Sequence, residues 1–134
     1  MDQQLRIDVW QRAKAVCESC HMPQQFDPAG FEMDHIIAEK HHGPTTLENL
    51  ALACFPCNNH KGPNIAGYDL ETRQTIPLFN PRTQSWTEHF EWQGAKLVGR
   101  TPVGRVTVDV LDINLPHRVS HREALMLEGV FPLA

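Results

Sequence analysis

Four cysteines are the residues in this 134-residue chain whose spacing most clearly predicts chemistry. They form two pairs with the same spacing, Cys17-x-x-Cys20 and Cys54-x-x-Cys57, separated by 33 residues. Two residues between paired thiolates let both sulfurs reach one tetrahedral ion from a tight turn. Four thiolates complete the coordination of Zn²⁺ and leave no open position for a substrate. The cysteines therefore predict one zinc ion with a structural role.

Other interpretations of the cysteines stay open at this stage. The two pairs could be unrelated knuckles, reduced buried thiols, or the redox pairs of a cytosolic oxidoreductase. Cysteines in a small intracellular protein are more often metal ligands than disulfides. Retention of stoichiometric zinc under mild oxidant would count against the redox interpretation.

Polar residues between and just after the cysteine pairs could hydrolyse a phosphodiester. Such cleavage needs a nucleophile in line with the leaving oxygen and positive charge on the phosphoryl oxygens. A neutral imidazole, whose ordinary pKa is about 6.5, can take a proton from water. Carboxylate and amide oxygens suit a hard divalent cation such as Mg²⁺. We therefore expect His35 to act as general base, and Asp34 and Asn58 to hold a catalytic cation together with water and phosphate.

This expectation sets a condition on the backbone. Adjacent residues of a strand point to opposite faces, so Asp34 and His35 can flank one phosphate only if the strand ends or twists there. We expect that it does.

The same segment resembles the HNH endonuclease family over residues 17–62. The matching residues are Asp34-His35-Ile36-Ile37, Asn49-Leu50, and the run CFPCNNHKG that starts at Cys54. The resemblance implies an α+β fold with a zinc-braced ββα-metal core, and Asn58 at the third motif position makes the chain an H-N-N variant. By similarity, Asn49 is not a ligand but bridges a loop and orients His35. Ala38 departs from the pattern, because many relatives have proline there.

Basic residues around this motif allow several roles. His60 could be a metal ligand, a phosphate or DNA contact, or a surface residue. Lys61 could contact phosphate or be a solvated lysine. His41 and His42 lie in the loop expected to overhang the site, where a solvated pair is favoured over a metal site.

The elements that must position these groups follow from hydrophobic spacing. A helix over residues 2–16 delivers Cys17, residues 21–30 form a loop, and residues 31–38 form a strand. After a loop over 39–46, residues 47–53 begin as a turn and become the strand that delivers Cys54. A helix starting near Cys57 or Asn58 should be short, because Gly62 and Pro63 weaken a helix interior.

We expect one domain over residues 1–134, with a core at 17–67 and a hairpin and helix extension at 68–134. Residues 67–80 favour turn and loop, with a possible local turn at Asp69 and Thr72 and an apolar segment at 78–80 that packs on the core. A hairpin is expected over 86–100 with its turn at 93–94. Residues 101–111 have strand-forming valines, but Thr101-Pro102 favours a helix, and residues 116–129 favour another.

Two further sets of residues have a structural and a functional interpretation. The hairpin aromatics fit a core better than base stacking, and they are Trp86, Phe90 and Trp92. Candidates for contacts to a nucleic-acid backbone are Arg73, Arg82, Arg100 and Arg105.

The net charge of −4 argues mildly against tight, sequence-independent DNA binding. The excess acid lies in residues 1–71, which carry five Lys/Arg and ten Asp/Glu, and this is the part expected to bind cations. No apolar run reaches the ~20 residues of a membrane helix, and the polar N-terminus lacks the apolar core of a signal peptide. These features predict a cytoplasmic protein.

The sequence thus predicts a metal-dependent endonuclease, a hydrolase that cuts DNA phosphodiester bonds. The alternative is a non-catalytic zinc module of the same fold that binds nucleic acid or protein. The presence of Asp34 and His35 favours the enzyme, since a zinc adaptor has no use for them.

Overall fold

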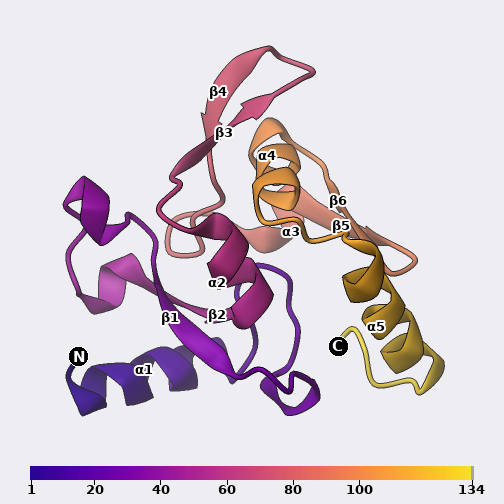
Figure 1. Ribbon diagram of the computed structural model, residues 1–134, viewed down its shortest axis with the longest axis horizontal. Coiled ribbons are helices and arrows are strands. Elements are labelled where there is room, and N and C mark those ends of the chain that lie inside the picture. Colours follow the sequence, from indigo (N-terminus) through magenta and orange to yellow (C-terminus); the bar gives the residue numbers. More distant parts are fainter. Residues whose placement is uncertain (134) are drawn as a thin grey trace.

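A computed structural model of the chain describes residues 1–133. Within them, the fold is α+β, as predicted, and its three antiparallel sheets are all two-stranded. The N-terminal half contains α1 (Gln3–Ala13), β1 (Phe31–His35), β2 (Leu50–Cys54) and α2 (Phe55–Lys61). The C-terminal half contains β3 (Ala66–Asp69), β4 (Gln74–Pro77), α3 (Trp86–His89), β5 (Phe90–Gln93), β6 (Lys96–Gly99), α4 (Pro102–Val110) and α5 (Pro116–Leu127) (Figure 1).

The ββα unit expected from the sequence is formed by β1, β2 and α2. The two strands are antiparallel, and their register pairs Phe31 with Cys54 and His35 with Leu50. Every residue of β2 is buried, and the strand continues directly into α2. The short 3₁₀ turn Leu47–Asn49 precedes β2, so the predicted order of turn followed by strand is confirmed.

Helix α1 packs on one face of this unit. The side chain of Asp2 accepts a hydrogen bond from the Gln4 amide and caps the helix, and the buried Val9 packs against Leu50 and Leu52. The helix ends three residues before the predicted boundary at residue 16. It ends there because Lys14 adopts a left-handed backbone with φ of 56°, which turns the chain towards the first cysteine pair.

Two other boundaries differ from the expected ones, and both matter for the site. Strand β1 ends at His35 and not at residue 38, so the break expected beside Asp34 and His35 is present. Helix α2 begins at Phe55, earlier than predicted, because Pro56 is tolerated in the first turn of a helix. It is short, as expected, and ends at Lys61, because the next residue, Gly62, leaves the helical conformation with a φ of 51°.

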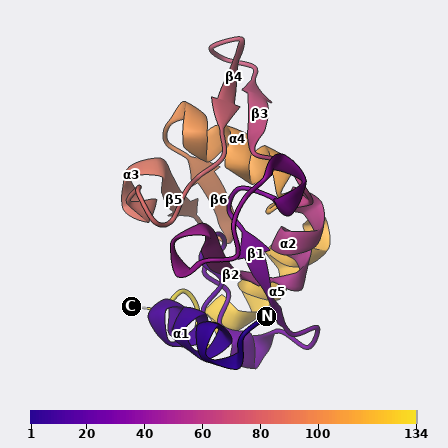
Figure 2. The same cartoon turned by 90° about the vertical axis from the view of Figure 1, so that its left-hand side faces the viewer.

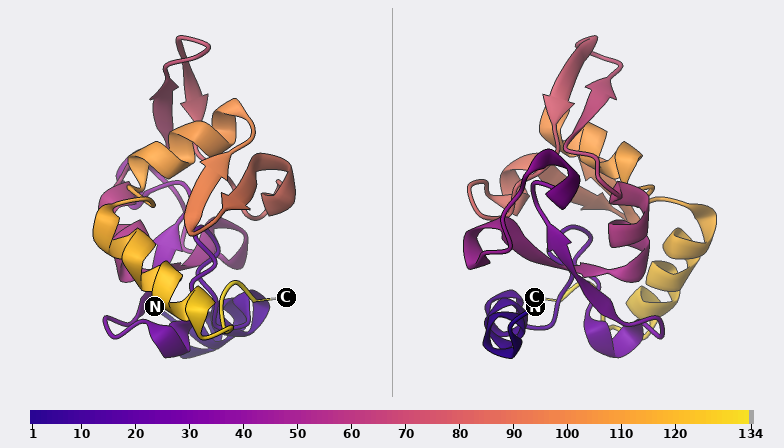
Figure 3. Two further views of the ribbon diagram at one scale, coloured as in Figure 1. Left: turned by 90° about the vertical axis from the view of Figure 1, so that its right-hand side faces the viewer. Right: turned by 60° about the vertical axis from the view of Figure 1, so that its left-hand side comes forward.

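The prediction of turn and loop over residues 67–80 was wrong for half of that segment, which is strand. Strands β3 and β4 form a hairpin that projects from the body of the molecule (Figures 1, 2 and 3). The predicted local turn closes it: Asp69 Oδ2 accepts hydrogen bonds from the Thr72 amide at 3.1 Å and hydroxyl at 2.7 Å. The hairpin was missed because its outer residues are exposed and lack a clear apolar alternation.

The remaining extension follows the sequence closely. The β5–β6 hairpin is present with its turn at residues 94–95, one position later than predicted, and α3 precedes it. Thr101 caps α4 by accepting from the Gly104 amide at 3.1 Å, so the helix over 101–111 is confirmed. Helix α5 begins at Pro116, as predicted.

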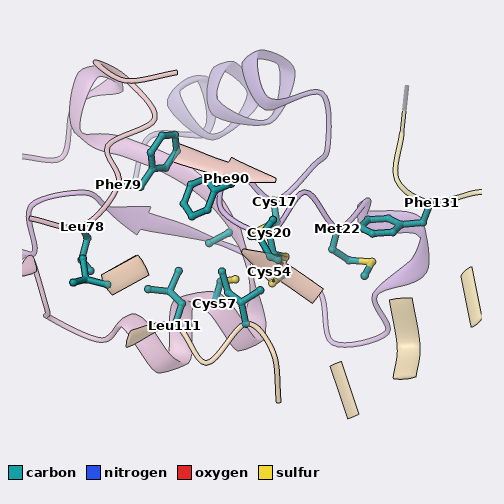
Figure 4. Close-up of a cluster of buried hydrophobic side chains, with 14 of the residues drawn as sticks. Cys17, Cys20, Met22, Cys54, Cys57, Leu78, Phe79, Phe90, Leu111 and Phe131 are labelled. Carbon is teal, nitrogen blue, oxygen red and sulfur yellow. Dashed lines mark hydrogen bonds between the residues drawn. The ribbon is translucent and has the colours of Figure 1, made fainter. Parts of the chain in front are cut away.

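One hydrophobic cluster joins the two halves of the chain. It contains all four cysteines together with side chains of the extension, among them Phe79, Phe90, Val106 and Leu111 (Figure 4). The segment at 78–80 packs into it, as expected. No helix within residues 1–133 is long and apolar enough to cross a membrane.

Candidate active site

The four cysteine sulfurs lie together in the buried core. All four Sγ atoms lie within 4.8 Å of one another, and the Cys20–Cys54 pair is 3.6 Å apart (Figure 4). Sulfurs bound to tetrahedral zinc at 2.3 Å are separated by about 3.8 Å. The cysteines are free thiols with at most 1% of their surface exposed. The prediction that the two pairs come together where they could hold one metal ion is confirmed, and the all-sulfur set fits Zn²⁺.

The chain brings the pairs together from different elements. Cys17 and Cys20 lie in the turn after α1, whereas Cys54 ends β2 and Cys57 lies in the first turn of α2. Burial raises the pKa of the Cys17 thiol. A bound cation would offset this effect, because metal ligation requires the thiolate.

Asp34, His35 and Asn58 line one cavity of about 340 Å³. It lies where β1 ends and α2 passes, and Glu39, Lys40 and Gly62 also border it. The strand contributes residues from both of its faces, since Asp34 and His35 are its last two residues. The geometric condition derived from the sequence is therefore met.

Asp34 is held by a buried lysine on α2. Lys61 Nζ donates to Asp34 Oδ1 at 3.0 Å and to the backbone oxygen of His35 at 2.9 Å. Burial raises the pKa of the Asp34 carboxyl, and the charge of Lys61 acts in the opposite direction. Lys61 is 6% exposed, so it is neither the solvated lysine nor the phosphate contact considered from the sequence.

The His35 ring forms a hydrogen bond with a residue that the sequence did not indicate. His35 Nε2 lies 2.9 Å from Thr45 Oγ1 and 3.7 Å from a carboxylate oxygen of Glu39. Thr45 is ten residues from His35, and no local pattern marks it as a partner.

Asn49 bridges the loop, as the resemblance implied. Its Oδ1 accepts from the Ile37 amide at 2.9 Å, and its Nδ2 donates to the carbonyls of Ile37 and Pro44 at 3.0 and 2.9 Å. The loop is tight: a Cβ at Gly43 would lie 1.6 Å from the Ile37 oxygen. Asn49 thus supports the loop that carries Thr45, and its effect on the His35 ring is indirect.

Glu32 is a site residue that the sequence reasoning missed. Its carboxylate accepts a hydrogen bond from Asn58 Nδ2. Glu32 and Asp34 are two residues apart on β1 and share a face, which is the face that meets α2. The sequence signal for Glu32 was its position two residues before Asp34, the predicted cation ligand.

His60 points away from the cavity. Its Nδ1 lies 3.1 Å from Asp112 Oδ2, in the segment between α4 and α5. His41 and His42 are exposed, which agrees with a solvated pair.

The hairpin aromatics are core residues, as favoured from the sequence. Phe90 is 2% exposed, and Trp86 and Trp92 pack against the same cluster. The ring centroids of Trp86 and Phe90 are 5.2 Å apart. These rings brace the cysteine site and are not a free stacking surface.

Three of the four arginine candidates have partners within the described chain. Arg82 pairs with Glu18, Arg105 pairs with Asp69 and Glu71, and Arg100 donates to the Thr87 carbonyl. A contact with a nucleic acid would compete with these partners. Arg73, at the turn of the projecting hairpin, is exposed.

The sequence of residues 15–64 matches the family model of the HNH endonucleases. This segment is similar to the HNH endonucleases. Its bounds include the four cysteines and every residue expected at the cavity. The HNH match supports a nuclease-type function, and β3 to α5 lie outside it.

A curated relative agrees with the HNH assignment. The chain is 40% identical over 63 residues to the CRISPR-associated endonuclease Cas9 of Corynebacterium diphtheriae. The similarity covers 42% of this chain and 6% of that protein, so it concerns a part of this chain and a small part of Cas9. No solved structure matches the chain significantly.

Proposed function

We propose that this chain is a metal-dependent HNH endonuclease that hydrolyses DNA phosphodiester bonds. The observation that carries the proposal is the single cavity that Asp34, His35 and Asn58 line within the HNH segment. An imidazole beside a carboxylate and an amide oxygen is the set of groups that hydrolysis of a phosphodiester needs.

His35 is the general base in this proposal. With Nε2 donating to Thr45 Oγ1, Nδ1 carries the free lone pair and takes the proton from the attacking water. Asn49 holds the loop that carries Thr45, and this fixes the ring indirectly.

Oxygen ligands for a cation come from β1 and α2. Lys61 holds Asp34 Oδ1, so Oδ2 is the oxygen that would face the cation. Glu32 accepts from Asn58 Nδ2, which leaves the Asn58 carbonyl oxygen as the second ligand. Oxygen donors fit a hard ion such as Mg²⁺. When bound, the ion would neutralise charge on the phosphate and stabilise the leaving oxygen.

DNA is the proposed substrate, and binding to it is expected to be weak without a divalent cation. The net charge is −4, and three candidate arginines already have protein partners. Affinity from phosphate contacts alone is therefore small.

A plasmid-nicking assay tests the proposal. Wild-type protein with Mg²⁺ or Mn²⁺ should relax a supercoiled plasmid, and His35→Ala should lower the rate by roughly 10²–10⁴-fold. His41→Ala is the matched control, because this exposed histidine lies outside the residues that line the cavity. Zinc content measured in each variant verifies that the fold is retained.

The competing function is a non-catalytic zinc module that binds nucleic acid or protein. Binding to DNA without cleavage under any divalent ion would support it and contradict the endonuclease. A structured RNA of matched length, assayed in parallel, tests whether DNA is the preferred substrate. The redox alternative is not favoured, since reactive cysteines are partly exposed and these four are buried.

A further inference from the structure

A guanidinium from the C-terminal helix lies against the cysteine site. Arg118 of α5 places Nη2 3.0 Å from Cys57 Sγ and 3.9 Å from Cys54 Sγ. The side chain is buried, with only 6% of the residue's surface exposed. Arg118 lies well outside residues 15–64, so this contact is a feature of the extension and not of the matched HNH segment.

The same guanidinium is fixed from its other side. Arg118 Nη1 donates to the carbonyls of Leu111 at 2.9 Å and Asp112 at 3.1 Å. These residues lie between α4 and α5, and the Asp112 carboxylate is in turn 3.1 Å from His60 of α2. Arg118 therefore connects the cysteine site to the segment that packs against the end of α2.

The charge of a metal bound by four thiolates explains why a buried guanidinium would be favourable beside it. Four thiolates around one divalent cation carry a net charge of about −2, and in a buried site this charge needs compensation. An N–H donor to a metal-bound sulfur supplies a charge-assisted hydrogen bond. Outer-sphere partners of this kind orient the ligands and commonly account for a 10–100-fold change in metal affinity.

We propose that Arg118 is an outer-sphere partner of the cysteine-bound metal, donating a hydrogen bond to the Cys57 thiolate. In this arrangement, the extension strengthens metal retention, and the metal in turn strengthens the docking of α5, because linkage between two sites is reciprocal. The proposal concerns the cysteine site alone and is independent of whether the chain cuts DNA.

Arg122 offers a matched control on the same helix. It is 1% exposed, and its hydrogen bonds go to oxygen atoms: the carbonyls of Ala95 at 2.8 Å and Ile113 at 3.0 Å, and Asn114 Oδ1 at 3.0 Å. Arg122→Met therefore removes a buried guanidinium that docks α5 without removing a donor to sulfur.

The test is metal affinity of the full chain, measured by competition with a chromophoric zinc chelator. Arg118→Met should weaken zinc binding by roughly 10–100-fold, and Arg118→Lys should fall between it and wild type. Arg122→Met should stay within about threefold of wild type. In the cobalt-substituted protein, the sulfur-to-cobalt charge-transfer band should shift in Arg118→Met and not in Arg122→Met.

Two results would overturn the proposal. One is an unchanged zinc affinity and cobalt spectrum in Arg118→Met. The other is an equal loss of affinity in Arg118→Met and Arg122→Met, which would assign the effect to helix docking or to distant charge. If Arg118→Met fails to fold, Arg118→Lys decides, and wild-type affinity with a wild-type cobalt spectrum in that variant contradicts the role assigned to the guanidinium.

Discussion

At the scale of single residues, the carboxylate of Asp34 lies between a buried lysine and an open cavity. The Asp34 side chain is 13% exposed and that of Lys61 is 8% exposed, so water screens the ion pair only weakly. Burial raises the pKa of Asp34, which favours the neutral acid, whereas the ammonium favours the carboxylate that a cation would need. Lys61 is best understood as the residue that keeps Asp34 charged and in place.

Replacing Lys61 should therefore damage the fold before it affects any contact with substrate. Lys61→Met leaves a buried carboxylate without its partner, and we expect a loss of about 3–5 kcal/mol in the free energy of unfolding. Urea denaturation with zinc present measures this loss. Lys40→Met, which removes an exposed lysine at the same cavity, should change stability by less than about 0.5 kcal/mol.

A double substitution separates the ion pair from simple packing. Adding Asp34→Asn to Lys61→Met removes the unpaired charge, so the double variant should be less destabilised than the sum of the two single variants. Strict additivity would show that the two side chains are not coupled.

Glu32 yields a second prediction at this scale. Glu32→Ala frees the Asn58 amide to rotate, so the Mg²⁺ concentration for half-maximal cleavage should rise by roughly tenfold or more. Glu32→Gln keeps an oxygen acceptor and should recover much of this loss. A metal titration of cleavage rate compares the three proteins. If Glu32→Gln raises the required Mg²⁺ concentration as much as Glu32→Ala does, then the charge of the Glu32 carboxylate matters for metal binding, and its hydrogen bond to Asn58 does not.

At the scale of elements, helix α4 packs very closely on the segment before β5 and on β6. A Cβ built at Gly104 would lie 2.0 Å from the backbone oxygen of His89, and one at Gly99 would lie 2.2 Å from the backbone nitrogen of Arg105. The backbones approach so closely that only glycine fits at these two positions. This packing places Thr107 against the core segment at 78–80. The Thr107 hydroxyl accepts a hydrogen bond from the Phe79 amide at 2.9 Å.

Gly104→Ala should accordingly separate α4 from β6. Because the obstacle is backbone, relief requires the helix to move, and we expect a loss near or above the upper end of the 1–3 kcal/mol typical of overpacking. Gly67→Ala is the comparison, since its Cβ would meet side-chain atoms and no backbone: Val110 Cγ2 at 2.9 Å, a methyl group that can rotate away, and Val106 Cβ at 3.0 Å, where a smaller adjustment is needed. Thermal unfolding of the two variants should rank Gly104→Ala as the less stable, and the reverse ranking would contradict this packing argument.

At the scale of the whole molecule, the cysteine site lies at the point where the HNH segment and the extension meet. The cluster around the sulfurs includes Leu97 of β6, Val106 of α4 and Leu125 of α5. A metal bound there would stabilise both halves of the chain, since the same buried side chains pack against the ligands from each side.

Removal of the metal should therefore also destabilise the extension, which lies outside the HNH segment. Chelation of zinc, or Cys54→Ser, should lower the helical circular-dichroism signal and change the fluorescence of Trp86 and Trp92 in one transition, because both rings pack in the cysteine cluster. Added Zn²⁺ should restore both signals after chelation. A loss of helix with unchanged tryptophan fluorescence would show that the extension folds independently.

The sequence by itself determined the features that depend on local spacing. The two Cys-x-x-Cys pairs, the run around Asp34 and His35, and the Thr101-Pro102 start of α4 are patterns within a few residues of one another. Local geometry dictates what such patterns can form, so the shared cysteine site, the order of β1, β2 and α2, and the helix over 102–110 were predictable.

Only the tertiary structure decided which distant residues meet. Lys61 lies 27 positions from Asp34, Glu32 lies 26 positions from Asn58, and Arg118 lies 61 positions from Cys57. No local pattern identifies these partners, because a buried lysine and a helical arginine look the same in sequence whatever they contact. The spacing of Glu32 from Asp34 marks Glu32 as a neighbour of the site but does not identify Asn58 as its partner. Their partners were set by how β1, α2 and α5 pack around one core, and that packing depends on the whole chain.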